Sequence, residues 1–176
     1  MRNDLAYHGR PARGGGELMR FFEDIQVGDR RALGSFTFTA ADIKKFAAKF
    51  DPQRFHLDEE AGRKSLFGGL AASGWHVASV CMKLLVADGQ RHAREALARG
   101  EQVAVWGASP GFRELRWIRP VLAGDTISFA NEVVSKRSSE SRPGWGILQG
   151  SNSGTNQRGE EVFSFLATAF VPMRGS

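Results

Sequence analysis

The sequence predicts an α+β fold, in which an antiparallel β-sheet wraps around one long, buried central helix. Residues 75–86 are apolar nearly all round, which is typical of a helix that is buried on most sides. The second half of the chain instead shows short alternating segments separated by Gly, Pro and charged turns, as in antiparallel strands. The 176 residues suffice for one domain with its own core.

We expect a flexible tail over residues 1–20, because this segment is basic, rich in Gly and without hydrophobic periodicity. A single domain then covers residues 21–176. Residues 35–39 alternate as a strand does, and Thr39 can cap a helix that follows it. The apolar residues of that helix recur at helical spacing, namely Ile43, Phe46, Ala47 and Phe50.

Pro52 cannot continue this helix, so Asp51 is expected at a forced chain reversal. Residues 62–74 are rich in turn formers and lead into the long helix. We expect that helix to stop at Asp88-Gly89, because Gly is the preferred residue just after a helix end.

Turn signals divide the second half of the chain into strands. The expected strands cover residues 103–106, 112–118, 126–135, 145–153 and 162–171. Strand alternation would place Arg113 and Arg119 on one face and Arg116 on the other. These arginines are either solvated charges or contacts for the phosphates of a ligand, which suit a planar guanidinium.

Asp51 and His56 form an acid–imidazole pair on one short segment. Such a pair can hold one water between two groups that withdraw and return protons. The helix that opens at Ser73-Gly74 offers free backbone N–H groups to developing negative charge, and the backbone at Gly69 can approach a ligand closely. The pair alone is weak evidence, because Asp before Pro is also an ordinary turn former.

Composition narrows the possible functions. The net charge of +5 suits nucleic acid or a small anionic substrate, but the basic residues are not interleaved with aromatic ones, so we expect no nucleic-acid partner. Cys81 is the sole cysteine, and no His has partners at metal-ligand spacing, which argues against a metal site. Without a membrane-spanning run or signal peptide, we expect a cytoplasmic protein that binds no membrane.

From about Phe21 onward the chain resembles the MaoC-like dehydratases, the (R)-specific enoyl-CoA hydratases of the hotdog fold. The residues that carry the resemblance are Asp51-x4-His56, Phe67-Gly68-Gly69, Ser73-Gly74 and the segment 116–126, with its Pro-Val and Gly-Asp pairs. The resemblance implies a hydro-lyase that needs no cofactor and acts on an acyl-CoA substrate. Asp51 and His56 would activate one water, which adds to the double bond of a 2-enoyl thioester to give a (3R)-hydroxyacyl thioester.

The resemblance also implies that the Gly74 N–H binds the thioester oxygen, in an oxyanion and substrate-binding region that includes Ser73 and Gly69. A single hotdog leaves one sheet edge unpaired, so we expect a homodimer. The family's loop usually reads Asp-x-Asn-Pro-x-His, whereas here Pro52 directly follows Asp51 and Gln53 replaces Asn. Two alternatives therefore stay open, a non-catalytic acyl-thioester-binding protein and an acyl-CoA thioesterase on the same fold.

Overall fold

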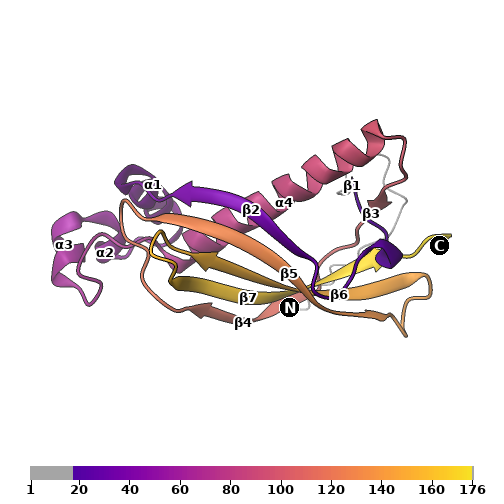
Figure 1. Ribbon diagram of the computed structural model, residues 1–176. Helices are drawn as coiled ribbons and strands as arrows, with labels where there is room; N and C mark the ends of the chain where they lie inside the picture. The colour runs from indigo at the N-terminus through magenta and orange to yellow at the C-terminus, as the bar shows by residue number, and fades with distance from the viewer. Residues whose placement is uncertain (1–17, 176) are drawn as a thin grey trace.

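The computed structural model describes residues 18–175 and contains one five-stranded antiparallel sheet (Figure 1). The order across the sheet is β2 (Arg30–Thr37), β5 (Thr126–Ser138), β6 (Trp145–Thr155), β7 (Glu161–Pro172) and β4 (Gly111–Trp117). A second, two-stranded sheet pairs β1 (Leu18–Met19) with β3 (Ala104–Val105). The antiparallel sheet and its strands after residue 100 were predicted from the turns, and the α+β class is confirmed.

Four α-helices and one short 3₁₀ helix, η1 (Phe22–Asp24), complete the described chain. They are α1 (Ala40–Phe50), α2 (Arg54–Leu57), α3 (Glu59–Lys64) and α4 (Gly74–Ala98). The predicted cap of α1 is confirmed, since the Thr39 hydroxyl accepts a hydrogen bond from the Asp42 N–H at 3.1 Å. In Figure 1, α1, α2 and α3 gather at one end of the sheet, and α4 runs from that end over the sheet and away from it. The sequence did not predict α2 or α3.

The main hydrophobic core joins the N-terminal half of α4 to the sheet. Its buried residues include Val77, Val80 and Cys81 of α4, together with Ile127 and Phe163 of the sheet. A second buried cluster lies elsewhere in the described chain and contains no residue of α4; its members are Ile25, Val133, Leu148 and Val171. The first half of α4 therefore belongs to the main core, whereas residues of α4 beyond Leu85 do not.

The predicted stop at Asp88-Gly89 is wrong, because α4 continues through both residues to Ala98. The buried Asp88 carboxylate accepts a hydrogen bond from the Arg31 guanidinium of β2 at 2.9 Å and is also paired with Arg91. These contacts stabilise the helix at Asp88. The neighbouring Gly89 lowers the stability of the helix by only about 1 kcal/mol relative to Ala. The helix ends instead at Ala98, and Gly100 just beyond it has a φ of +76°, which allows the N–H groups of residues 100 and 101 to bond the last carbonyls.

A bulge in β4 overturns the expected faces of the arginines. Arg113 lies opposite Leu166 of β7, and Arg116 lies opposite Ser164. A step of three residues along β4 therefore matches a step of two residues along β7. Arg113 and Arg116 therefore share a face of the sheet. Glu114, inside the bulge, has a φ of 55°, which absorbs the extra residue.

Most of the expected tail, residues 1–17, lies outside the described part of the chain. Residues 18–20 are joined to the domain. Leu18 and Met19 pair with β3, and the Arg20 guanidinium contacts the Asp29 carboxylate at 2.9 Å.

His76 of α4 is buried against aromatic rings and links α4 to α1. Its ring stacks on Phe46 with centroids 4.6 Å apart, and it meets Phe36 and Phe38 edge-on. Burial lowers the pKa of His76, and the nearby Asp42 carboxylate opposes that shift only in part. Among residues 18–175, no group accepts from or donates to its buried Nδ1. His76 is thus a packing residue that is best accommodated uncharged.

The free energy of unfolding should therefore fall as the pH drops from 7 to 5. The unfolded state takes up the proton of His76 near its ordinary pKa of about 6.5, whereas the folded state resists protonation until a lower pH. A His76→Phe variant keeps the aromatic stack and should lose this part of the pH dependence. Urea unfolding at several pH values measures the difference. Parallel stability–pH curves for the two proteins would contradict this account.

Two glycines before α4 differ in the space around them. A Cβ on Gly62 would lie 2.6 Å from the Gly69 carbonyl oxygen, whereas a Cβ on Gly69 would be in ordinary contact with Leu122 at 3.5 Å. Gly62→Ala should therefore lower the free energy of unfolding by about 1–3 kcal/mol, as overpacking does. Gly69→Ala is the matched control and should leave the urea midpoint nearly unchanged. Equal midpoints for the two variants would show that the Gly62–Gly69 approach does not constrain the chain.

Candidate active site

The end of α1 and the single turn of α2 position Asp51 and His56. The Asp51 N–H donates to the Ala47 carbonyl at 2.9 Å as the last hydrogen bond of α1, and Pro52 then turns the chain. The segment closes again at once, since the His56 N–H donates to the Gln53 carbonyl at 2.9 Å. The predicted loop is thus a helix end, a turn and a new helix, and it brings the two side chains together.

The two side chains lie in contact and are largely shielded from solvent. His56 Nε2 is 3.5 Å from Asp51 Oδ2, and the two side chains are 6% and 19% exposed. His56 Nδ1 lies 2.7 Å from the Ala71 carbonyl oxygen. A carbonyl can only accept a hydrogen bond, so Nδ1 carries a proton, and in the neutral tautomer that this bond selects the lone pair is on Nε2, the nitrogen that faces Asp51.

Asp51 is held in its ionised form. Burial favours the neutral acid, but hydrogen bonds from Ser73 and Gln53, together with the adjacent His56, outweigh burial and lower the pKa of Asp51. Gln53 Nε2 donates to Asp51 Oδ1 at 2.9 Å. Gln53, which the sequence marks only as a departure from the usual loop, is therefore a direct partner of the carboxylate.

The N-terminus of α4 adjoins this pair. Ser73 is 1% exposed and caps the helix, because its hydroxyl accepts from the Trp75 N–H at 3.2 Å. Gly74 is the first helical residue, and its N–H has no acceptor within residues 18–175. A Cβ at this position would overlap the indole of Trp117, so only Gly permits the close approach of β4 to the helix end.

A cavity of about 460 Å³ contains Asp51, His56 and Gly74 in its wall. The rest of the wall is mainly aromatic and aliphatic, with Phe50, Phe55, Phe67, Trp75, Val77, Trp117, Ile118, Val121 and Val162. Ser73 and Gly69 are not wall residues. Ser73 acts on the cavity through Asp51, and Gly69 lies close to Leu122.

Trp117 contributes to the wall from a distant strand, and no local pattern in the sequence marks it. Its ring meets Trp75 edge-to-face, with centroids 5.4 Å apart. Arg119 is the one member of the arginine series that lines this cavity. The site is therefore a mostly apolar chamber with an acid–base pair and a helix N-terminus at one wall.

Other reactive groups lie away from this chamber. Cys81 is buried, which raises the pKa of its thiol to about 12 and keeps it unreactive. In the part of the chain that the structure describes, no three His, Cys, Asp or Glu side chains are grouped as metal ligands would be. No helix among residues 18–175 is both long and apolar enough to cross a membrane.

The chain is similar to known proteins over most of its length. The chain is 42% identical to a MaoC-like dehydratase from Rhodospirillum rubrum, with a TM-score of 0.73 over 89% of this chain and 99% of that one. It is 30% identical to a monoamine oxidase regulatory protein from Archaeoglobus, with a TM-score of 0.72 over 88% and 95% of the two chains. An uncharacterised Bacillus subtilis protein, YdeM, is 29% identical over 80% of this chain and 91% of its own length.

The hotdog fold is likewise shared with known structures. A Mycobacterium tuberculosis protein with a double hotdog fold matches 90% of this chain and 46% of its own, at 21% identity and a TM-score of 0.66. At that identity the likeness concerns the fold alone, and it confirms the predicted hotdog. The family model of the MaoC-like domain matches residues 24–144, a span that includes Asp51, His56 and Gly74. The chain therefore belongs to the MaoC-like domain family.

Proposed function

We propose that this protein is a hydro-lyase that adds water reversibly to the 2,3 double bond of an enoyl-CoA thioester. The observation that carries the proposal is the juxtaposition of Asp51, His56 and the Gly74 N–H at one cavity wall, with His56 Nε2 and Asp51 Oδ2 3.5 Å apart. Family membership and the likeness to the R. rubrum MaoC-like dehydratase support the same reaction class.

In the proposed reaction, His56 and Asp51 share one water. A water oxygen about 2.8 Å from both Nε2 and Oδ2 fits the separation of these two atoms. The neutral Nε2 takes one proton from the water as the water oxygen bonds to C3 of the substrate. The ionised Asp51 accepts the other O–H, which orients the water and stabilises the imidazolium that forms.

The electrons of the double bond then move toward the thioester carbonyl and form an enolate. Its oxygen would be stabilised by the Gly74 N–H, because helix N-termini carry partial positive charge and this donor is unpaired within the described chain. The imidazolium returns its proton to C2, so that H and OH have been added and His56 is neutral again. No cofactor takes part in this scheme.

The apolar wall suits the acyl chain of the substrate, and Arg119 suits its charged portion. Arg119 already donates to the Glu161 carbonyl oxygen at 3.0 Å and so is held beside the cavity. A planar guanidinium in that position can bind a phosphate of coenzyme A. We propose that the reaction takes place in the cytoplasm, where acyl-CoA thioesters are present.

Asp51→Asn and His56→Ala, made separately, should each lower turnover of an enoyl-CoA substrate by roughly 10²–10⁴-fold, the usual contribution of general acid–base groups. The double variant should be little worse than the poorer single one, because the two groups act on one water. A panel of enoyl-CoA thioesters is assayed for loss of the conjugated double bond and, in parallel, for release of free thiol.

The matched control is Asp58→Ser. Asp58 lies in the same segment but caps α3 by accepting from the Ala61 N–H at 2.7 Å, a role that Ser can fill. This variant should retain near wild-type turnover. Thiol release by the wild type would favour the thioesterase, and thioester binding without turnover would favour the binding protein. An Asp51→Asn variant with most of its hydratase activity would refute the assignment.

We also propose that two copies form a homodimer through β4, the edge strand beside the candidate active site. β4 pairs with β7 on one side only, and Phe112, Trp117 and Trp75 nearby are each at least half exposed. An unpaired edge flanked by exposed aromatic side chains is suited to association. Multi-angle light scattering at micromolar concentration should give twice the chain mass. A fully active monomer under those conditions would contradict the dimer.

A further inference from the structure

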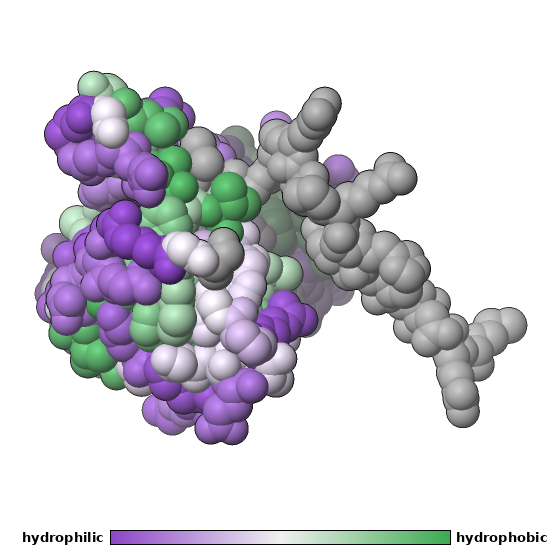
Figure 2. All heavy atoms as spheres, turned by 90° about the vertical axis from the view of Figure 1, so that its right-hand side faces the viewer, coloured by the Kyte–Doolittle hydropathy of each residue, from purple (hydrophilic) through white to green (hydrophobic). Residues whose placement is uncertain are grey.

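A second and larger cavity, of about 860 Å³, lies between the C-terminal half of α4 and the sheet. Its wall shares no residue with that of the candidate active site. Figure 2 views the molecule from this end and shows hydrophobic side chains between polar rims. The volume is within the range of about 300–1,000 Å³ that is typical of small-molecule sites.

Small residues on α4 make room for this cavity. Gly89, Ala93 and Ala96 all contribute to its wall, and their spacing places them on one helix face. Opposite them lies the second apolar cluster, with Ile25, Val133 and Leu148. These two apolar walls face each other across the cavity instead of packing together.

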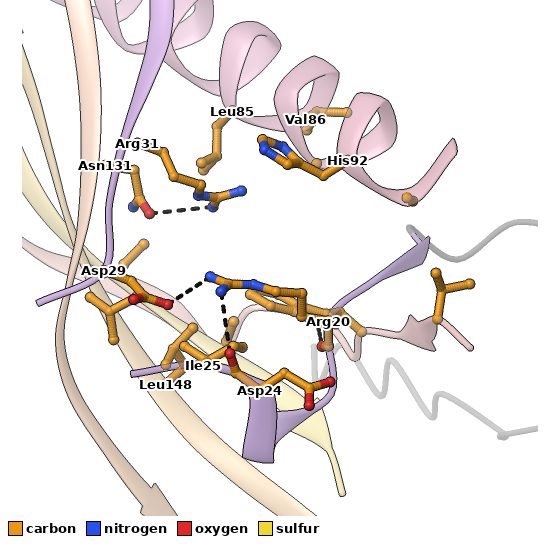
Figure 3. Close-up of a pocket in the computed structure, with 18 of the residues that line it drawn as sticks. Arg20, Asp24, Ile25, Asp29, Arg31, Leu85, Val86, His92, Asn131 and Leu148 are labelled. Carbon is orange, nitrogen blue, oxygen red and sulfur yellow. Dashed lines mark hydrogen bonds and ion pairs between the residues drawn. The ribbon is translucent and has the colours of Figure 1, made fainter. Parts of the chain in front are cut away.

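Two arginines enter the cavity from opposite walls (Figure 3). Arg31 comes from β2 and Arg20 from the segment that follows β1, and their guanidinium groups face the same space. Arg31 donates to Asp88 Oδ2 at 2.9 Å and to Asn131 Oδ1 at 3.4 Å. These two bonds use two of its five N–H groups, and the other three have no acceptor among residues 18–175.

Each of the two arginines already has a carboxylate partner, since Arg20 contacts Asp29 at 2.9 Å and Arg31 contacts Asp88 at 2.9 Å. The Asp88 carboxylate is also paired with Arg91, so Arg31 shares its partner with a second guanidinium. Burial lowers the pKa of Arg31, and the charges of Arg20 and Arg91 lower it further, while Asp88 and Asp29 oppose the shift. An anion placed between Arg20 and Arg31 would relieve both the desolvation and the repulsion.

From this arrangement we infer that the second cavity binds an aliphatic carboxylate, with its head between Arg20 and Arg31 and its chain along Gly89, Ala93 and the facing apolar cluster. A carboxylate matches the fork of a guanidinium, and the chain matches the apolar walls. The site is separate from the proposed hydratase chemistry and does not depend on it.

Sodium octanoate is the probe, titrated into the ¹⁵N-labelled full-length protein below its micelle-forming concentration. We expect saturable binding with about one octanoate per chain, and amide shifts centred on Arg31, Gly89 and Asn131, because these residues line the cavity. Octylamine has the same chain and the opposite charge, and it should bind at least about tenfold more weakly.

Arg31→Gln and Arg20→Gln should each weaken octanoate binding by about tenfold or more, since each removes a charged donor to the carboxylate. Arg137→Gln is the matched control, an exposed arginine on β5 outside the cavity wall, and should bind octanoate as the wild type does. Asp51→Asn should also bind normally. If Arg31→Gln fails to fold, Arg20→Gln alone tests the inference. The Arg20 side chain is 45% exposed, so its replacement should not prevent folding.

No saturable octanoate binding by the wild type would overturn the inference. So would affinity that is unchanged in both arginine variants, or amide shifts centred on Asp51 and Gly74. Loss of hydratase activity in the Asp51 and His56 variants with intact octanoate binding would separate this site from the proposed active site.

Discussion

The first turn of α4 is the constraint on which the candidate active site depends. Ser73 caps the helix and, together with Gln53 and His56, lowers the pKa of Asp51, so the same hydroxyl contributes to the helix start and to the ionisation of the acid. Gly74 follows at once, and its lack of a side chain lets Trp117 of β4 close the cavity. One turn thus adjoins the acid, forms part of the cavity wall and supplies a free N–H donor.

His56 completes this arrangement from the other side. Its Nδ1 is fixed by the Ala71 carbonyl, which belongs to the segment that leads into Ser73. The orientation of the imidazole and the start of α4 are therefore set by neighbouring residues of one chain segment. This explains why a loop with Pro52 and Gln53 in unusual places still brings acid and imidazole together: the ends of the segment are held by α1 and by residues 71–73, and Gln53 supports Asp51 directly.

Local chemistry predicted much of the fold. Thr39 and Pro52 marked the limits of α1, and turns such as Gly124-Asp125 separated the strands.

The prediction failed where a distant residue decided the outcome. Asp88-Gly89 has the local signature of a helix end, but Arg31, 57 residues earlier, holds Asp88 inside the helix. Likewise, the bulge between Arg113 and Arg116 is visible only in the pairing with β7, and Trp117 enters the cavity wall through packing across the fold.

The two halves of α4 differ in their surroundings, and each half adjoins one of the two cavities. The first half belongs to the main core and is fixed by apolar contacts, so the Ser73–Gly74 end is rigidly placed. The second half has no share in the apolar cluster that faces it across the second cavity, and its Asp88 is paired with Arg31 of β2. A buried ion pair contributes little net stability, because desolvation offsets most of its attraction. A carboxylate ligand in the second cavity would add contacts between the second half of α4 and the apolar cluster that faces it. The main core lies between this cavity and the Ser73–Gly74 end of the helix, and it would keep the candidate active site in place.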